Sequence, residues 1–201
     1  MRGVILINLN DYNIFKNNIS TLKETSIDDH DKTNIKYMTS SEQEAINFDD
    51  VKRQYIKGLS LSEEPKSNDA LFINKNNDLV FVEFKNGFMD NSKKFAVRKK
   101  IYDSIIILTD IMNIGVSQLK NNMEYILVYN EEINKNEKDV LEKQKSFVQP
   151  SAAFDNIAKT ISAMAKTEYV CFGVKIFENY CFRKVHTYTE VEFENYLKNA
   201  I

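Results

Sequence analysis

Apolar residues recur along the chain at two spacings, which predict strands in some segments and helices in others. Short runs rich in apolar and β-branched residues predict strands at 69–74, 79–85 and 123–130. Apolar residues three or four apart predict helices at about 11–22, 39–56, 91–112, 150–164 and 190–200. Because strands and helices alternate, the pattern predicts an α/β fold with a central mixed β-sheet flanked by α-helices.

Length and composition favour one domain spanning residues 1–201. The 201 residues are 43% hydrophobic, enough for one sizeable core, and only five Gly and two Pro occur. Two cysteines are too few for a disulfide framework and lack zinc-site spacing, so we expect free thiols. The longest apolar run, 105–116, is interrupted by Asp110 and is too short to cross a bilayer. These features predict a cytoplasmic protein with no membrane partner.

The distribution of charge is more informative than its sum. A net charge of −2 argues against a non-specific nucleic-acid-binding protein, because such binding depends on neutralising many phosphates. The start of the predicted helix at 91–112 is nevertheless strongly basic and contains no acid as far as Tyr102, whereas 41–50 is acidic. Arg98, Lys99 and Lys100 are therefore candidates for contacts with a phosphate backbone.

Two charged residues interrupt the most apolar predicted strand. Glu83 and Lys85 stand two apart within 79-LVFVEFK-85, where an unpaired buried charge is costly. Solvated charges on an edge strand are the ordinary explanation of a lone Glu-x-Lys. Here the preceding strand begins with Asp69, so a second carboxylate is available nearby.

The relative position of Asp69 and Glu83 depends on the hairpin register. For Asp69 to lie opposite Glu83, Asn74 must lie opposite Asp78, which leaves a three-residue loop at 75–77. A two-residue loop at Asn76 and Asn77 would instead place Asp69 on the other face. With the three-residue loop, Asp69, Glu83 and Lys85 share one face, because residues i and i+2 of a strand point together.

The order of these residues, with 68-ND-69 followed by 83-EFK-85, resembles the PD-(D/E)xK nuclease superfamily. Asn68 stands where the motif is named for Pro. The resemblance covers about residues 40–130, with 150–201 completing the sheet and helices. It implies a restriction-endonuclease-like core and a metal-dependent phosphodiester hydrolase.

The resemblance also implies roles for particular residues. Asp69, Glu83 and the backbone carbonyl of Phe84 would hold Mg²⁺, for which Mn²⁺ would substitute, and Lys85 would orient or deprotonate a water. Glu44 matches the acidic residue that joins such sites from a preceding helix. On the predicted helix at 39–56 it shares the apolar face, whereas Asp49 and Asp50 point to water.

The resemblance favours a DNA endonuclease in restriction, phage defence or mobile-element biology. Duplex cleavage requires two active sites, so a homodimer is compatible with this function. Two alternatives remain open: an RNA-directed nuclease or toxin with the same site, and a non-catalytic member of the fold that binds nucleic acid or a protein.

Overall fold

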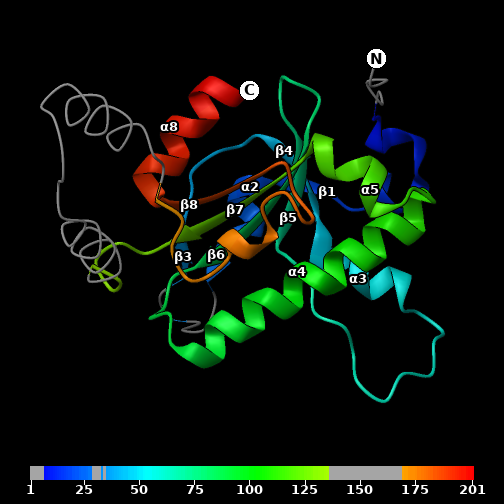
Figure 1. Ribbon diagram of the computed structural model, residues 1–201, viewed down its shortest axis with the longest axis horizontal. Coiled ribbons are helices and arrows are strands. Elements are labelled where there is room, and N and C mark those ends of the chain that lie inside the picture. Colours follow the sequence, from blue (N-terminus) through cyan, green and yellow to red (C-terminus); the bar gives the residue numbers. More distant parts are fainter. Residues whose placement is uncertain (1–6, 29–32, 34, 136–168) are drawn as a thin grey trace, which may run out of the picture.

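The computed structural model describes residues 7–28, 33, 35–135 and 169–201, and its centre is a six-stranded mixed sheet (Figure 1). The strand order is β1-β4-β5-β6-β7-β8; neighbours are antiparallel from β1 to β6 and parallel from β6 to β8. The strands are β1 (Ile19–Thr21), β4 (Glu44–Asn47), β5 (Ala70–Ile73), β6 (Leu79–Lys85), β7 (Met123–Tyr129) and β8 (Lys184–Thr189). The predicted α/β class with a mixed sheet is confirmed.

The remaining elements are helices, most of them short, and a two-stranded ribbon. The ribbon pairs β2 (Ile27–Asp28) with β3 (Lys36–Tyr37). The α-helices are α1 (Asn13–Lys16), α2 (Leu22–Thr25), α3 (Phe48–Tyr55), α4 (Asn91–Met112), α5 (Val116–Leu119) and α8 (Glu190–Ala200). The 3₁₀ helices are η1 (Leu9–Asp11), η2 (Lys120–Asn122) and η3 (Lys175–Phe177).

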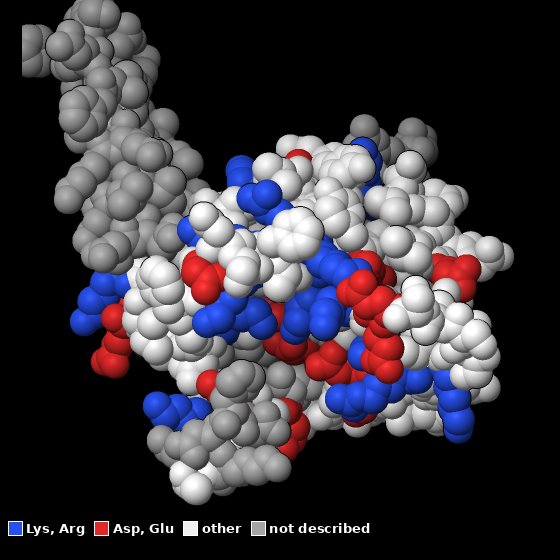
Figure 2. All heavy atoms as spheres, turned by 90° about the horizontal axis from the view of Figure 1, so that it is seen from below, with Lys and Arg blue, Asp and Glu red and all other residues white. Residues whose placement is uncertain are grey.

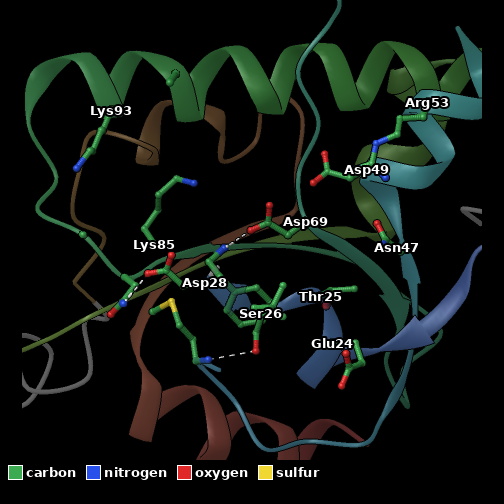
Figure 3. Close-up of a pocket in the computed structure, with 16 residues that line it drawn as sticks. Glu24, Thr25, Ser26, Asp28, Asn47, Asp49, Arg53, Asp69, Lys85 and Lys93 are labelled. Atoms are coloured by element: carbon green, nitrogen blue, oxygen red, sulfur yellow. Dashed lines mark hydrogen bonds between the residues drawn. The ribbon is translucent and has the colours of Figure 1, made fainter. Parts of the chain in front are cut away.

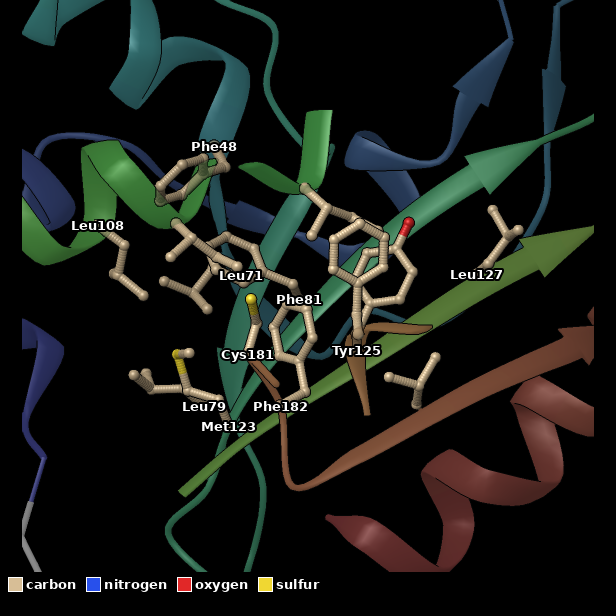
Figure 4. Close-up of a cluster of buried hydrophobic side chains, with 14 of the residues drawn as sticks. Phe48, Leu71, Leu79, Phe81, Leu108, Met123, Tyr125, Leu127, Cys181 and Phe182 are labelled. Atoms are coloured by element: carbon tan, nitrogen blue, oxygen red, sulfur yellow. The ribbon is translucent and has the colours of Figure 1, made fainter. Parts of the chain in front are cut away.

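Helices cover both faces of the sheet. On one face, α3 and α4 bury side chains such as Phe48 and Leu108 against Leu71, Phe81 and other alternate strand residues (Figure 4). On the other face, α8 packs Phe193 and Leu197 on the intervening residues. The two-residue alternation of a strand thus divides the buried residues of β6 between two cores. Glu83 lies on the α3 and α4 face.

The hairpin register confirms the three-residue loop. Ala70 lies opposite Val82 and Ile73 lies opposite Leu79, which places Asp69 next in line with Glu83. The Asn74 N–H donates to the Asp78 carbonyl at 3.0 Å and closes the loop over residues 75–77. Within the loop Asn77 adopts φ 63°, a left-handed conformation that Asn tolerates better than most residues.

Two helix predictions in the first quarter of the chain are wrong in extent. Residues 44–47 form β4, between β1 and β5, and only 48–55 are helical; the predicted helix at 11–22 is interrupted by β1. Residues 44–47 form their backbone hydrogen bonds by pairing with β1 and β5. The sequence pattern of this segment alone predicts a helix because it does not show these partners. The predicted helix at 150–164 lies outside the described residues.

The long helix and the C-terminal helix are found where predicted. Asp90 caps α4 by accepting from the Lys93 N–H at 2.8 Å, and Thr189 forms a capping box with Glu192 at the start of α8. Within the described part of the chain, no helix combines the length and apolar character needed to cross a membrane.

Candidate active site

The predicted motif residues converge on one face of the sheet beneath α4. Lys100, from α4, places its Nζ 3.0 Å from Asp69 Oδ1 and 2.7 Å from Glu83 Oε1. Lys85 also contacts Glu83 Oε1. Two carboxylates and two ammonium groups from three separate segments therefore form a single ionic cluster.

Hydrogen bonds to the backbone on either side fix the position of Asp69. Its second oxygen, Oδ2, accepts from the Phe84 N–H at 2.7 Å, and its carbonyl accepts from the Phe48 N–H at the start of α3 at 3.1 Å. The preceding residue, Asn68, contacts α4, because its N–H donates to Ser104 Oγ at 2.8 Å. The sheet, α3 and α4 all hold this short segment.

Glu83 is fully buried, while the other members of the cluster reach solvent. Its side chain is 0% exposed, compared with 16% for Asp69, 20% for Lys100 and 24% for Lys85. Burial raises the pKa of Glu83, and the Asp69 charge adds to this effect, while Lys100 and Lys85 partly offset it. Burial alone would lower the pKa of Lys100, but the charges and hydrogen bonds of Glu83 and Asp69 outweigh it and the pKa is raised.

Several buried polar atoms near the cluster are unpaired within the described residues. Glu83 Oε2, both side-chain amide atoms of Asn68 and the Tyr125 hydroxyl have no hydrogen-bond partner there. Burial raises the pKa of Tyr125 well above its usual value, and the charges of Glu83 and Asp69 contribute. Because an unpaired buried polar atom is costly, the site has capacity for additional polar ligands.

The cluster borders an open cleft of about 620 Å³. Asp69, Phe84 and Lys85 line one part of it, and residues 24–28 line another. Figure 3 shows Asp69, Asp49 and Lys85 pointing into the space beneath α4, with Lys93 at the start of that helix. The cleft therefore combines acidic groups that can bind a cation with basic groups that can bind a phosphate.

The donor set fits a hard divalent cation. Asp69 Oδ1 and Glu83 Oε1 already share one cationic neighbour, Lys100 Nζ, and Glu83 Oε2 is a further unpaired oxygen. Mg²⁺ is commonly held by one or two carboxylates together with waters and substrate phosphates. No group of three or more His, Cys, Asp or Glu side chains is placed for metal binding in the described ranges.

The geometry also supports the Phe84 carbonyl as a ligand candidate. The N–H and C=O of one strand residue point to the same edge. Because the Phe84 N–H points to Asp69, its carbonyl points to that side as well, beyond the end of β5. This carbonyl is therefore directed away from β7.

The structure does not bring Glu44 into the site. Glu44 is exposed at the start of β4, where it lies opposite Thr21, and Asn47 at the other end of that strand is the residue opposite Ala70. Glu44 is therefore at the end of β4 remote from Asp69, and its predicted position on an inward helix face is wrong.

Asp49 takes the place that was expected for Glu44. It lies in the first turn of α3, accepts a hydrogen bond from Ser67 Oγ and lines the cleft, so the prediction that it points to water is wrong. Asn47 caps α3 by accepting a hydrogen bond from the Asp50 N–H, which places Asp49 in the first turn of the helix. The prediction of a longer helix at 39–56 missed this helix start.

The three basic candidates of α4 have different surroundings. Lys100 belongs to the ionic cluster, Lys99 pairs with Asp103 at 2.8 Å, and Arg98 approaches Gly173. Viewed from the side of α4, Lys and Arg gather over the middle of the molecule beside a group of acids (Figure 2). Phosphate binding by Arg98 and Lys99 stays a prediction. Lys93, in the same basic segment, lines the cleft.

Comparison with known proteins finds no relative: no protein-family model, no curated protein and no solved structure matches this chain.

Proposed function

We propose that this protein is a metal-dependent phosphodiester hydrolase resembling PD-(D/E)xK nucleases, with DNA as the favoured substrate. The observation that carries the proposal is the convergence of Asp69 and Glu83, from neighbouring strands, on one cationic position beside Lys85. Asp69 borders a cleft, and Glu83 Oε2 has no hydrogen-bond partner within the described residues, so the pair is placed to bind a cation.

The architecture supports the same proposal. An antiparallel hairpin carries the acidic residues and the lysine, a long helix follows it, and the next strand returns parallel to β6. This order agrees with a restriction-endonuclease-like core, in which a helix crosses from the motif strand to a parallel neighbour. The α3 helix before the hairpin supplies Asp49.

Asp69 and Glu83 would hold Mg²⁺ through their carboxylates, and Phe84 through its carbonyl. When bound, the metal polarises the scissile phosphate and lowers the pKa of a water. Lys85, which contacts Glu83 and lines the cleft, would orient that water by donating to it. Lys93 and Arg53, on the cleft wall, would position the phosphate backbone.

A cleavage assay on DNA and on RNA tests the proposal. Purified protein would be incubated with Mg²⁺, Mn²⁺ or EDTA and with supercoiled plasmid, linear duplex or single-stranded RNA. We expect metal-dependent nicking of DNA by the wild type, loss of it in Glu83→Gln, and full activity in Glu44→Gln as the matched control. Cleavage restricted to RNA would favour the RNA-directed alternative. Cleavage of neither polymer would contradict the catalytic proposal and favour a binding role.

The proposed biological setting follows from the function. A small endonuclease of this type suits restriction, phage defence or mobile-element biology, and a homodimer would supply the two sites that cut a duplex. Sedimentation of the protein with and without duplex DNA would measure the oligomeric state.

A further inference from the structure

The Lys100 ammonium occupies the position between the two carboxylates that the proposed metal would use. Lys100 Nζ is 3.0 Å from Asp69 Oδ1 and 2.7 Å from Glu83 Oε1, and it comes from α4, whereas the motif lysine Lys85 comes from β6. Both lysines contact the same oxygen, Glu83 Oε1. The cluster therefore has one more ammonium group than the sequence motif assigns to it.

The charges of the cluster balance without a metal ion. Two carboxylates face two ammonium groups, and Asp69 Oδ2 is already engaged by the Phe84 N–H. A divalent cation bound to Asp69 Oδ1 and Glu83 Oε1 would lie in direct contact with Lys100 Nζ. Repulsion between charges at such distances is strong in a partly buried site, so the cation and the ammonium group compete for the same oxygens.

Lys100 lies on the same side of α4 as a residue that lines the cleft. Lys100 lies seven positions after Lys93, so the two residues lie on the same side of α4, two turns apart. Lys93 lines the cleft, and the Lys100 side chain is 20% exposed. The long flexible stem of a lysine allows its ammonium group to move by several ångströms without a change in the helix.

We propose that Lys100 is a resident counter-ion of the carboxylate pair, that the metal displaces it, and that the released ammonium group then binds the substrate phosphate. This inference rests on the proposed function of the site. It explains how the two carboxylates lie close together before a metal binds, and it couples metal binding to phosphate binding through one side chain.

Metal binding without substrate tests the competition directly. Free Mn²⁺ would be followed by electron paramagnetic resonance in titrations of wild type, Lys100→Met, Lys100→Arg and Lys99→Met. We expect Lys100→Met to bind Mn²⁺ about tenfold more tightly than wild type, because no ammonium group has to be displaced. Lys100→Arg keeps the charge and should stay close to wild type. Lys99→Met, whose native partner is Asp103, should be unchanged.

A second measurement uses the wild-type protein and does not depend on a variant folding. An amine-acylating reagent would be applied with and without Mn²⁺, and labelling of each lysine would be measured by mass spectrometry. Release from the carboxylates should increase labelling of Lys100 severalfold, with Lys99 in the same helix as the internal reference.

The outcomes separate this inference from the proposed function. Equal or weaker Mn²⁺ binding by Lys100→Met, or unchanged labelling of Lys100 on Mn²⁺ addition, would overturn the inference even if the wild type cleaves DNA. Tighter binding by Lys100→Met together with no cleavage of DNA or RNA by the wild type would uphold the competition and reject the nuclease.

Discussion

Asp69 Oδ2 accepts a 2.7 Å hydrogen bond from the backbone N–H of Phe84, the residue between Glu83 and Lys85. This bond joins the beginning of one strand to the end of the next and orients the first carboxylate towards the second. The other oxygen of Asp69 is thereby directed to Lys100. The arrangement separates the two roles of Asp69, one in holding the hairpin and one in binding a cation, and each role can be tested.

Substitution of Asp69 should separate its charge from its hydrogen bond. Asp69→Asn keeps an oxygen acceptor for the Phe84 N–H and removes the charge, so we expect cleavage to fall by about 10² to 10³ with little loss of stability. Asp69→Ala removes both the charge and the acceptor. It should reduce the free energy of unfolding by about 1–3 kcal/mol more than Asp69→Asn does. Urea unfolding and plasmid nicking measure the two effects. Wild-type cleavage by Asp69→Asn would contradict the proposed metal ligand.

The buried carboxyl of Glu83 should give stability a specific pH dependence. Burial, together with the Asp69 charge, raises its pKa above the ordinary 4.5 in the folded state. A folded state with the higher pKa binds the proton more tightly, so this group's contribution to stability falls as pH rises from 4.5 through the raised value. The wild type should therefore lose stability relative to Glu83→Gln across that window, as measured by urea unfolding.

Metal should act on the same group in the opposite direction. Because a cation binds the ionised carboxylate, added Mg²⁺ should shift the titration of Glu83 to lower pH. The decline in stability relative to Glu83→Gln should then end at a lower pH and be smaller. Parallel stability curves for the two proteins at every pH would show that Glu83 does not titrate as described.

Substitutions of Asp49 and Glu44 test which of these two acidic residues acts at the site. Asp49 lines the cleft, while Glu44 is exposed at the far end of β4. Asp49→Ala should lower the cleavage rate by about tenfold, an effect of about 1.4 kcal/mol on the barrier, whereas Glu44→Ala should leave it unchanged. The rates would be compared at saturating Mg²⁺. The reverse result would restore Glu44 to the site and require a different arrangement of β4.

The hairpin loop should depend on a left-handed residue at Asn77. Its φ of 63° is costly for a β-branched side chain, so Asn77→Val should reduce the free energy of unfolding by about 1–2 kcal/mol. Asn76→Val serves as the neighbouring control, because Asn76 does not have a positive φ. Equal effects of the two substitutions, measured by urea unfolding, would argue against the observed loop conformation.

The hairpin and its motif could be predicted from the sequence because the determinants are local. The alternation of β6, the Asn residues of the loop and the spacing of Glu83 and Lys85 all lie within a short segment, and pairing follows from loop length. Helix α4 was predictable for a similar reason, since its apolar residues repeat over several turns. Not every apolar residue of this helix is buried, because Phe95 is 71% exposed.

Other features depend on contacts that sequence patterns do not contain. The segment 44–47 has residues that suit a helix, but pairing with β1 and β5 makes it a strand, which moves Glu44 away from the site. Lys100 and Lys99 are alike in sequence. Only the packing of α4 over β6 assigns Lys100 to the carboxylates and Lys99 to Asp103. Tertiary packing thus decided which charged residues meet.

The proposed function requires that Asp69 and Glu83 together bind a divalent cation. Anomalous diffraction from crystals soaked in Mn²⁺ tests it most directly. We expect a peak about 2.1 Å from an oxygen of each carboxylate, with the Lys100 ammonium displaced from its position between them. A structure in which the two carboxylates lie on opposite faces of the hairpin, or in which Mn²⁺ binds elsewhere and Lys100 stays between them, would contradict the claim.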